Sequence, residues 1–371
     1  MLIQNAKAFI DGKFQEKTDL LIRDGRISAI GTGLAAEGEE LLDLGGDLLL
    51  PGFVDVHIHA FKGMDTMQGE EAVRHMSREL KKVGVAAFLP TTMSASPEDT
   101  VRALAGVKAV MERPEPDGAI VLGAHMEAPF LAEAKAGAQL KQYFADPNEE
   151  NWQRYTGGLE SVVRLITMAP ERAGALAFIS ALTKKGITVS IGHTTADAET
   201  THAAAEAGAT HVTHTFNAQT PLNHRAPGVP GAALVDDRLQ CEVISDGIHL
   251  HPDIVKLLIR VKGREKLVAI TDAMEAAGMP DGQYQLGGQE VFVHEGAARL
   301  KDGTLAGSTL TMVRAFQNLM RFGATPEEAA LMTTKTPALS IGNEELGEIE
   351  LGAPAIFSRF DENYAFKGTV G

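Results

Sequence analysis

The stretch Pro51-Gly-Phe-Val-Asp-Val-His57-Ile-His59 decides the fold and carries the first chemical signal in the chain. Apolar residues at 54, 56 and 58 alternate with polar ones, which predicts a β-strand. Because residues two apart in a strand point to the same side, His57 and His59 are expected to face one way at the strand's end. There they could share a metal ion, although two solvated histidines on a half-exposed strand would give the same pattern.

From Leu48 onward, strand-like apolar runs alternate with helix-like segments. Eight runs occur, at residues 52–58, 85–91, 119–126, 162–168, 187–192, 211–215, 241–245 and 267–271. The clearest helical spacing of apolar residues lies at 252–262 and 171–185. Eight βα units in order favour a parallel, TIM-like (β/α)8 barrel of the α/β class, although an open sheet would share much of this pattern.

Both ends of the chain are rich in expected β-structure. Residues 1–50 contain Asp-Gly turns at 11–12 and 24–25 between apolar runs, which is a strong hairpin signal. After the eighth run we expect a hairpin at 283–300, helices near 308–322 and 326–334, and short strands at 347–352 and 355–358. The predicted domains are therefore a barrel at 51–342 and a small β-sandwich domain built from 1–50 and 343–371.

Composition and net charge restrict the kinds of partner and the cellular setting expected for this chain. The 371 residues are 44% hydrophobic and 22% charged, which is ordinary for a soluble globular protein. A formal net charge of -15 argues against nucleic acid and anionic membranes as partners. The start of the chain has no signal-peptide pattern, and no apolar run approaches the roughly 18 residues that a membrane helix needs. A single cysteine, Cys241, favours a cytoplasmic setting.

Polar residues follow nearly every expected strand, at the end where a (β/α)8 barrel has its active site. They are His57 and His59, Thr91-Thr92, Glu127, Pro170-Glu171, His193, His214, Asp246 to His249, and Asp272. Histidine together with carboxylate suits zinc or iron(II) with an open position for water. The absence of cysteine ligands argues against a closed structural zinc site. The pattern therefore predicts a catalytic divalent metal.

Asp272 is the candidate acid and base. A bound divalent ion lowers the pKa of its water to about 7 and polarises a carbonyl oxygen. A carboxylate beside that water can take its proton and pass it to a leaving group. Asp272 ends the last expected strand in Ala269-Ile-Thr-Asp272-Ala and fits this role, while a cap for the following turn is the structural alternative.

Several phrases together resemble the N-acetylglucosamine-6-phosphate deacetylase family of the amidohydrolase superfamily, and the similarity runs across nearly the whole chain. They are Pro51 to His59, Gly123-Ala-His-Met-Glu127-Ala-Pro-Phe, Gly192-His193-Thr-Thr-Ala, His214-Thr-Phe-Asn217-Ala218, Ser245-Asp-Gly-Ile-His249 and Leu305-Ala-Gly-Ser.

The resemblance implies a role for each matching residue. Asp272 matches the general base that later protonates the departing amine. The matching metal ligands are Glu127, His193 and His214, together with His57 and His59, a pair that holds a second metal in some members. The matching substrate-binding positions are Ala138, Gln139, Asn217, Ala218, Arg225, His249, Leu305, Ala306 and Gly307.

Arg225 lies in a Pro/Gly-rich loop, where a guanidinium could grip a phosphate bidentately, although a surface ion pair would also explain it. In relatives, part of the phosphate site comes from a neighbouring subunit, which implies a homodimer.

Two positions depart from the family pattern. Ala128 follows the metal-binding Glu127 where the family usually has glycine. Gln139 stands where relatives commonly have a histidine that polarises the acetyl carbonyl. Glutamine can donate a hydrogen bond but carries no charge, so it should stabilise the oxyanion less.

The expected function is removal of acetate from N-acetyl-D-glucosamine 6-phosphate by metal-bound hydroxide, with Asp272 moving the proton and one or two divalent ions, zinc or iron, in each subunit. Alternatives are N-acetylgalactosamine 6-phosphate or another amide, such as a cyclic ureide, as the substrate. Ureide-cleaving relatives typically bridge two metals with a modified lysine, and Glu127 stands at that place here. An alternative of a different class is a non-enzymatic barrel scaffold.

Overall fold

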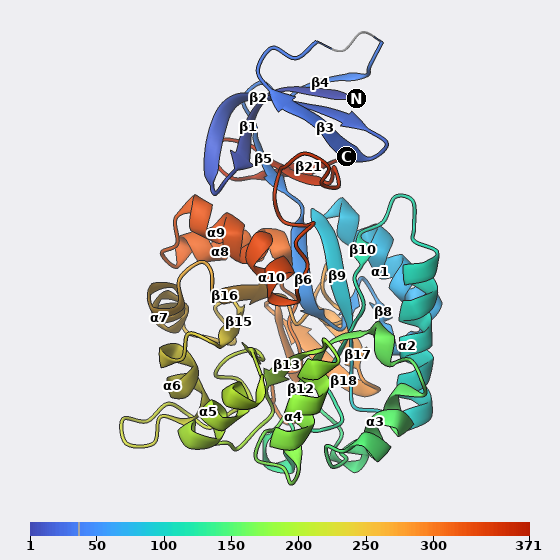
Figure 1. Cartoon of the computed structure of the whole chain (residues 1–371), viewed down its shortest axis with the longest axis vertical. Coiled ribbons are helices and arrows are strands. Elements are labelled where there is room, and N and C mark those ends of the chain that lie inside the picture. Colours follow the sequence, from blue (N-terminus) through green and yellow to red (C-terminus); the bar gives the residue numbers. More distant parts are fainter. Residues whose placement is uncertain (36–37) are drawn as a thin grey trace.

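A parallel β-barrel forms the centre of the molecule in the computed structural model, which describes residues 1–35 and 38–371 (Figure 1). β10 and β11 both pair with β9 and act as one interrupted strand. Each of the eight expected runs contains a barrel strand, so the alternating βα pattern is confirmed. The strands are β6 (Phe53–Ile58), β9 (Val85–Thr92), β10 (Ile120–Val121), β11 (Ala124–Met126), β12 (Val163–Met168), β13 (Thr188–Ile191), β14 (His211–Val212), β15 (Gln240–Ile244) and β16 (Leu267–Ile270).

The barrel closes where the last strand, β16, meets the first, β6. Ile58 forms a parallel bridge with Ala273, and the Asp272 amide donates to the His57 carbonyl at 2.8 Å. Deeper in the wall, the Thr271 hydroxyl donates to the Asp55 carboxylate at 2.6 Å. These contacts decide between the two sheet architectures in favour of the closed barrel.

Helices cover the outside of the barrel (Figure 1). α7 begins directly at Pro252, is capped by His251, and ends before Gly263 with Arg260 and Lys262 in its last turn, where basic side chains suit the helix dipole. The helices are α1 (Glu70–Lys82), α2 (Pro97–Glu112), α3 (Glu149–Thr156), α4 (Ala175–Lys184), α5 (Ala198–Ala207), α6 (Gly228–Val235), α7 (Pro252–Lys262), α8 (Met312–Arg321), α9 (Pro326–Thr333) and α10 (Lys335–Ser340).

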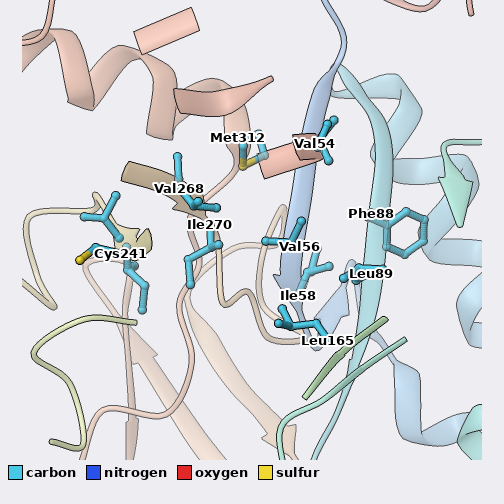
Figure 2. Packing of buried hydrophobic residues seen from close by; sticks show 14 of the residues in the cluster. Val54, Val56, Ile58, Phe88, Leu89, Leu165, Cys241, Val268, Ile270 and Met312 are labelled. Atoms are coloured by element: carbon cyan, nitrogen blue, oxygen red, sulfur yellow. The ribbon is translucent and has the colours of Figure 1, made fainter. Parts of the chain in front are cut away.

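Alternation along β6 separates packing from chemistry. Val54, Val56 and Ile58 are fully buried in the main hydrophobic core, which also contains Met312 of α8 (Figure 2). Burial of each such side chain contributes about 1.5–3 kcal/mol. Of the residues between them, His57 contacts Glu127 and Glu242, and Asp55 contacts Thr271, directly after the last barrel strand. The apolar half of the strand therefore anchors it, and the polar half is left for the site.

The two ends of the chain form one sheet, above the barrel in Figure 1, with both termini at this end of the molecule. The order is β21-β20-β5-β1-β2-β3, with β4 beside β1, and β20 pairs antiparallel with β5. The expected pairing of the two ends is thus confirmed, while the domain boundaries at 50 and 342 stay a prediction. The strands are β1 (Leu2–Ile10), β2 (Lys13–Arg23), β3 (Arg26–Gly31), β4 (Leu41–Asp43), β5 (Leu48–Pro51), β20 (Phe357–Phe360) and β21 (Phe366–Val370).

The prediction of a strand at 347–352 is wrong, because the described residues between α10 and β20 form no strand. Gly347 has a φ of +86° and lies so close to the Lys335 backbone that a Cβ would fall 2.5 Å from its Cα. The side chain of Glu348 pairs with the same lysine. The chain turns at this point to pack on α10, and extended structure begins only at β20.

The inserted antiparallel hairpin is confirmed, with β17 (Gly282–Leu286) and β18 (Gln289–His294) joined at Gly287-Gly288 and followed by β19 (Ala297–Leu300). A short ribbon of β7 (Ala60–Phe61) and β8 (Met64–Asp65) follows β6. Among the described residues, no helix combines the length and apolar character needed to cross a membrane.

Candidate metal centre and active site

All five expected ligand side chains converge at the C-terminal mouth of the barrel. His57 lies near the end of β6 and His59 directly after it; Glu127 directly follows β11, and His193 and His214 lie two residues past the ends of β13 and β14. Two potential metal-binding groups result, His57/His59/Glu127 and Glu127/His193/His214, with the donor atoms of each within 4.8 Å of one another. Glu127 belongs to both groups and is the centre of the cluster.

Hydrogen bonds on the far side of the imidazole rings fix which nitrogen faces the cluster. His193 Nδ1 lies 2.8 Å from the Lys135 carbonyl oxygen, and His59 Nδ1 lies 3.2 Å from that of Thr91. A carbonyl oxygen only accepts, so Nδ1 carries the hydrogen in both rings. In a neutral ring the Nε2 lone pair is then left pointing at the cluster, as metal coordination requires.

These Nε2 atoms face carboxylate oxygens. Glu127 Oε1 is 3.1 Å from Nε2 of both His193 and His214, and Glu127 Oε2 is 3.2 Å from Nε2 of His59. Lone pairs facing carboxylates repel unless a cation lies between them. His57 Nε2 is buried and has no hydrogen-bond partner among the described residues. The donor set and its orientation therefore fit a bound divalent ion.

The pKa values of His57 and Glu127 are shifted in the directions expected for closely spaced imidazoles and carboxylates. Burial alone would lower the pKa of His57, but the Asp272 and Glu127 carboxylates outweigh it and raise that pKa to about 9. Burial would raise the pKa of Glu127, but the neighbouring histidines, His57 first, hold it well below its ordinary value. Without a metal, protons on His57 and His59, whose pKa values are both raised by the carboxylates, supply positive charge, and metal binding would displace them.

Asp272 lies at the rim of the cluster, with Oδ1 3.2 Å from His59 Nε2. Its backbone has a φ of 49°, a strained conformation for this residue type. The Ser308 amide donates to the Asp272 carbonyl at 2.7 Å, and a Cβ on Gly307 would lie 3.1 Å from the same oxygen. Glycine at 307 therefore lets the loop approach and hold Asp272 in place.

The metal cluster forms the floor of a cavity of about 310 Å³. His249 lines it, and its Nδ1 lies 2.7 Å from the Asp246 carboxylate, which fixes the ring. Seven of the nine expected substrate-binding residues line this cavity, namely Ala138, Gln139, Asn217, Ala218, His249, Leu305 and Gly307.

Two expected substrate-binding residues do not line this cavity. Ala306 is fully buried between its two cavity-lining neighbours. Arg225 is exposed and lines a separate cavity of about 730 Å³ together with Asp197, Glu199 and Asn223. Within one chain the structure therefore does not bring Arg225 to the metal cluster.

Gln139 contacts the cluster through the carboxylate of Glu127. Its Oε1 accepts from the Ser94 amide at 2.7 Å, and its Nε2 donates to Glu127 Oε2 at 2.5 Å. The same side chain lines the cavity. Gln139 therefore supports the shared metal ligand from the side on which a substrate would enter.

Three buried polar residues, Glu242, Asp55 and His125, surround the cluster. No role was assigned to Glu242 or Asp55 from the sequence. Glu242 of β15 contacts His57, and burial raises the pKa of Asp55, on β6, to about 7 against the opposing effect of Thr271. The available signal was a lone carboxylate inside an apolar strand run. His125, two residues before Glu127, packs edge-on against the His57 ring at a centroid distance of 4.5 Å.

Comparison with known proteins agrees with this geometry. Residues 48–368 match the model of the amidohydrolase family. The chain is 36% identical to an N-acetylglucosamine-6-phosphate deacetylase of Lysinibacillus sphaericus, over 100% of this chain and 96% of that protein. It is also 36% identical to an N-acetylgalactosamine-6-phosphate deacetylase of Escherichia coli O157:H7, over 91% and 88% of the two chains.

Solved structures match at full length. The structure of a point mutant of N-acetyl-D-glucosamine-6-phosphate deacetylase from Mycobacterium smegmatis, in complex with N-acetyl-D-glucosamine-6-phosphate, superposes with a TM-score of 0.92 at 31% identity, covering 100% of this chain and 97% of that one. The chain thus belongs to the amidohydrolase family and, within it, to the N-acetylglucosamine-6-phosphate deacetylases.

Proposed function

We propose that this protein hydrolyses the acetamide bond of N-acetyl-D-glucosamine 6-phosphate, giving D-glucosamine 6-phosphate and acetate. The observation that carries the proposal is the convergence of four imidazoles on Glu127 beside Asp272, at the floor of the 310 Å³ cavity. Relatives at 36% identity over the whole chain are deacetylases of this sugar phosphate. An intact donor set with an acid/base carboxylate also speaks against a non-enzymatic scaffold.

One or two divalent ions, zinc or iron, are the proposed cofactors. Glu127, His193 and His214 would hold one ion, and His57, His59 and Glu127 a second. When bound, such an ion makes water acidic near neutral pH and polarises a carbonyl oxygen. Imidazole and carboxylate donors suit both metals, so availability decides between them.

Asp272 is the proposed proton carrier. Burial would raise the pKa of Asp272, but His57 and His59 outweigh it and lower that pKa, so the group is a carboxylate at neutral pH. It lines the cavity, where it can accept a proton from the attacking water. Returning this proton to the sugar nitrogen turns the amine into a good leaving group.

The cavity walls supply the substrate contacts. His249, fixed by Asp246, and the Asn217 amide offer hydrogen bonds to the sugar and its acyl group. Gln139 Nε2 donates to Glu127 and also contacts the Met93 sulfur at 3.5 Å; with substrate bound, it would donate to the developing oxyanion in place of this weak sulfur contact. The Leu305 to Gly307 segment forms the facing wall.

Arg225 is proposed to bind the phosphate in a homodimer. The side chain is exposed and does not line the metal-site cavity of its own chain, which suits a residue that serves the metal-site cavity of a second copy. A guanidinium pairs with phosphate through two parallel hydrogen bonds. In a chain of net charge -15, a local cation is needed to hold an anionic substrate.

A cytoplasmic setting, suggested by the single cysteine, stays part of the proposal.

The galacto epimer is the second candidate, because the N-acetylgalactosamine-6-phosphate deacetylase relative has the same 36% identity to this chain as the N-acetylglucosamine-6-phosphate deacetylase of Lysinibacillus sphaericus. Acetate release should be measured from both sugar phosphates and from unphosphorylated N-acetylglucosamine, with metal-loaded protein. The proposal predicts the largest kcat/KM for the gluco phosphate and little release without phosphate. A larger kcat/KM for the galacto phosphate would make N-acetylgalactosamine 6-phosphate the preferred substrate. No acetate release from any of the three sugars would overturn the proposed function.

A further inference from the structure

The buried carboxylate of Glu242 lies directly behind the metal cluster, against the His57 ring. Glu242 is on β15, within the apolar run Cys241 to Ile244, and is fully buried. Its Oε2 lies 3.1 Å from His57 Nδ1 and 3.1 Å from the backbone nitrogen of His214. One oxygen thus joins two expected ligand residues that lie 185 and 28 positions away in the chain.

Fold stability alone does not account for this carboxylate. Burying a charged group costs more than its hydrogen bonds usually return, and a well-packed apolar side chain would be the more stable choice. The second oxygen, Oε1, has no hydrogen-bond partner among the described residues. The neighbours Cys241 and Val243 on the same strand are apolar and fully buried. The carboxylate therefore fits a role towards positive charge in the cluster.

We infer that Glu242 is a positioning residue for the second metal ion. By accepting the Nδ1 hydrogen of His57, it fixes the ring with Nε2 directed at Glu127 and Asp272, at 3.5 and 3.6 Å. Supporting carboxylates of this kind orient a ligating histidine and make it a better donor. The negative charge of Glu242 also offsets part of the charge of the second divalent ion. Glu127 alone would not balance that charge, because it is shared between the two metal-binding groups.

The effect is specific to one of the two metal-binding groups. Glu242 contacts the ring of His57 but touches His214 only at its backbone nitrogen. The His193 ring is held independently by the Lys135 carbonyl oxygen, and the His59 ring by that of Thr91. Loss of Glu242 should therefore release the ion of the His57/His59/Glu127 group and spare the ion of the Glu127/His193/His214 group.

Two substitutions separate the hydrogen bond from the charge. Glu242→Met keeps the length of the side chain and removes the acceptor, whereas Glu242→Gln keeps one acceptor oxygen and removes the charge. Val243→Ala is the matched control, because it weakens the packing of the same strand without touching a ligand residue. Each protein is stripped with a chelator, titrated with zinc by calorimetry, and assayed for bound metal after dialysis.

Wild-type protein and Val243→Ala should bind two ions, although the control melts at a lower temperature. Glu242→Met should retain one ion, and Glu242→Gln should retain two, with the second bound about 10–100-fold more weakly. A folded Glu242→Met with two ions of unchanged affinity, or with none, would overturn the inference, as would unchanged second-ion affinity in Glu242→Gln.

The inference rests on the metal site of the proposed function but not on its substrate, so the two can fail separately. A wild-type protein that binds one ion and releases acetate would overturn the role of Glu242 and leave the deacetylase standing. If the wild type binds two ions and Glu242→Met loses one, but no acetate is released, the role of Glu242 stands and the proposed deacetylase function is overturned.

Discussion

The Nε2 atoms of His193 and His214 lie 3.1 Å apart, and each is also 3.1 Å from the same oxygen of Glu127. Two imidazole nitrogens and a carboxylate oxygen crowd together in this way when a cation draws them in. Because Glu127 is shared by both metal-binding groups and His57 belongs to one, substitutions at these two residues should have different effects on metal content.

Glu127→Gln should bind essentially no metal and release no acetate, since both groups lose their common carboxylate. His57→Asn should keep one ion and part of its turnover, because the Glu127/His193/His214 group is intact. Metal analysis of the two purified variants, with circular dichroism to verify folding, checks the difference. Equal metal content in both would show that Glu127 is not the shared ligand.

Stability of the metal-free protein should depend on pH above neutrality. The pKa of His57 is about 9 in the fold, against about 6.5 for an ordinary histidine. The folded state therefore binds more protons, and the resulting stability is fully present below about pH 6.5 and lost as pH rises through 9. Asp55, with a pKa of about 7, and His211, with a pKa of about 4, change charge mainly below this range.

Melting temperatures at pH 7.5 and 9.5 test this dependence. The metal-free protein should melt lower at pH 9.5, whereas the metal-loaded protein should not show this loss, because its imidazoles are already deprotonated. A metal-free melting temperature that stays level or rises across this range would contradict the assigned charge of the cluster.

Asp272→Asn should separate substrate binding from turnover. The amide keeps the shape of the side chain and its place at the rim, but it cannot take a proton. We expect kcat to fall by about 10²–10⁴-fold, with metal content unchanged and substrate affinity within a few-fold of the original. Isothermal titration with the sugar phosphate and steady-state kinetics supply the two readouts. Unchanged kcat would assign the proton transfer to another group.

Arg225 offers a test of the homodimer. Arg225→Ala should raise KM for the phosphorylated sugar by about 10–100-fold, as expected for loss of a charged hydrogen bond. If Arg225 serves the partner's cavity, mixing Arg225→Ala with Asp272→Asn and allowing subunits to exchange should restore activity, because one cavity of each mixed dimer has both native side chains. No recovery after verified exchange would place Arg225 in its own subunit's site or outside the site altogether.

Most of the fold could be predicted because the apolar periodicity is strong and local. The eight barrel strands, the hairpin at Gly287-Gly288 and the α7 helix all follow from alternation, turn residues and helical spacing. The segment 347–352 was misread, because its alternating residues look extended while the actual constraint is a tertiary contact of Gly347 with Lys335. Such a contact leaves no periodic trace in the sequence.

The site was predictable in its ligands and less so in their surroundings. His57, Glu127 and the other donors follow strands, so their convergence is a consequence of barrel geometry. The bond between Glu242 and His57 spans the barrel and depends on which strands lie opposite each other. The exposed place of Arg225 depends on a loop whose path no strand or helix period describes.

Metal-dependent deacetylation is tested most directly by the initial rate of acetate release from N-acetylglucosamine 6-phosphate by chelator-stripped protein titrated with zinc or iron(II). We expect no release from the stripped protein and a rate that rises with bound metal to a plateau at one or two ions per chain. Full activity in protein shown to be free of metal would contradict this expectation.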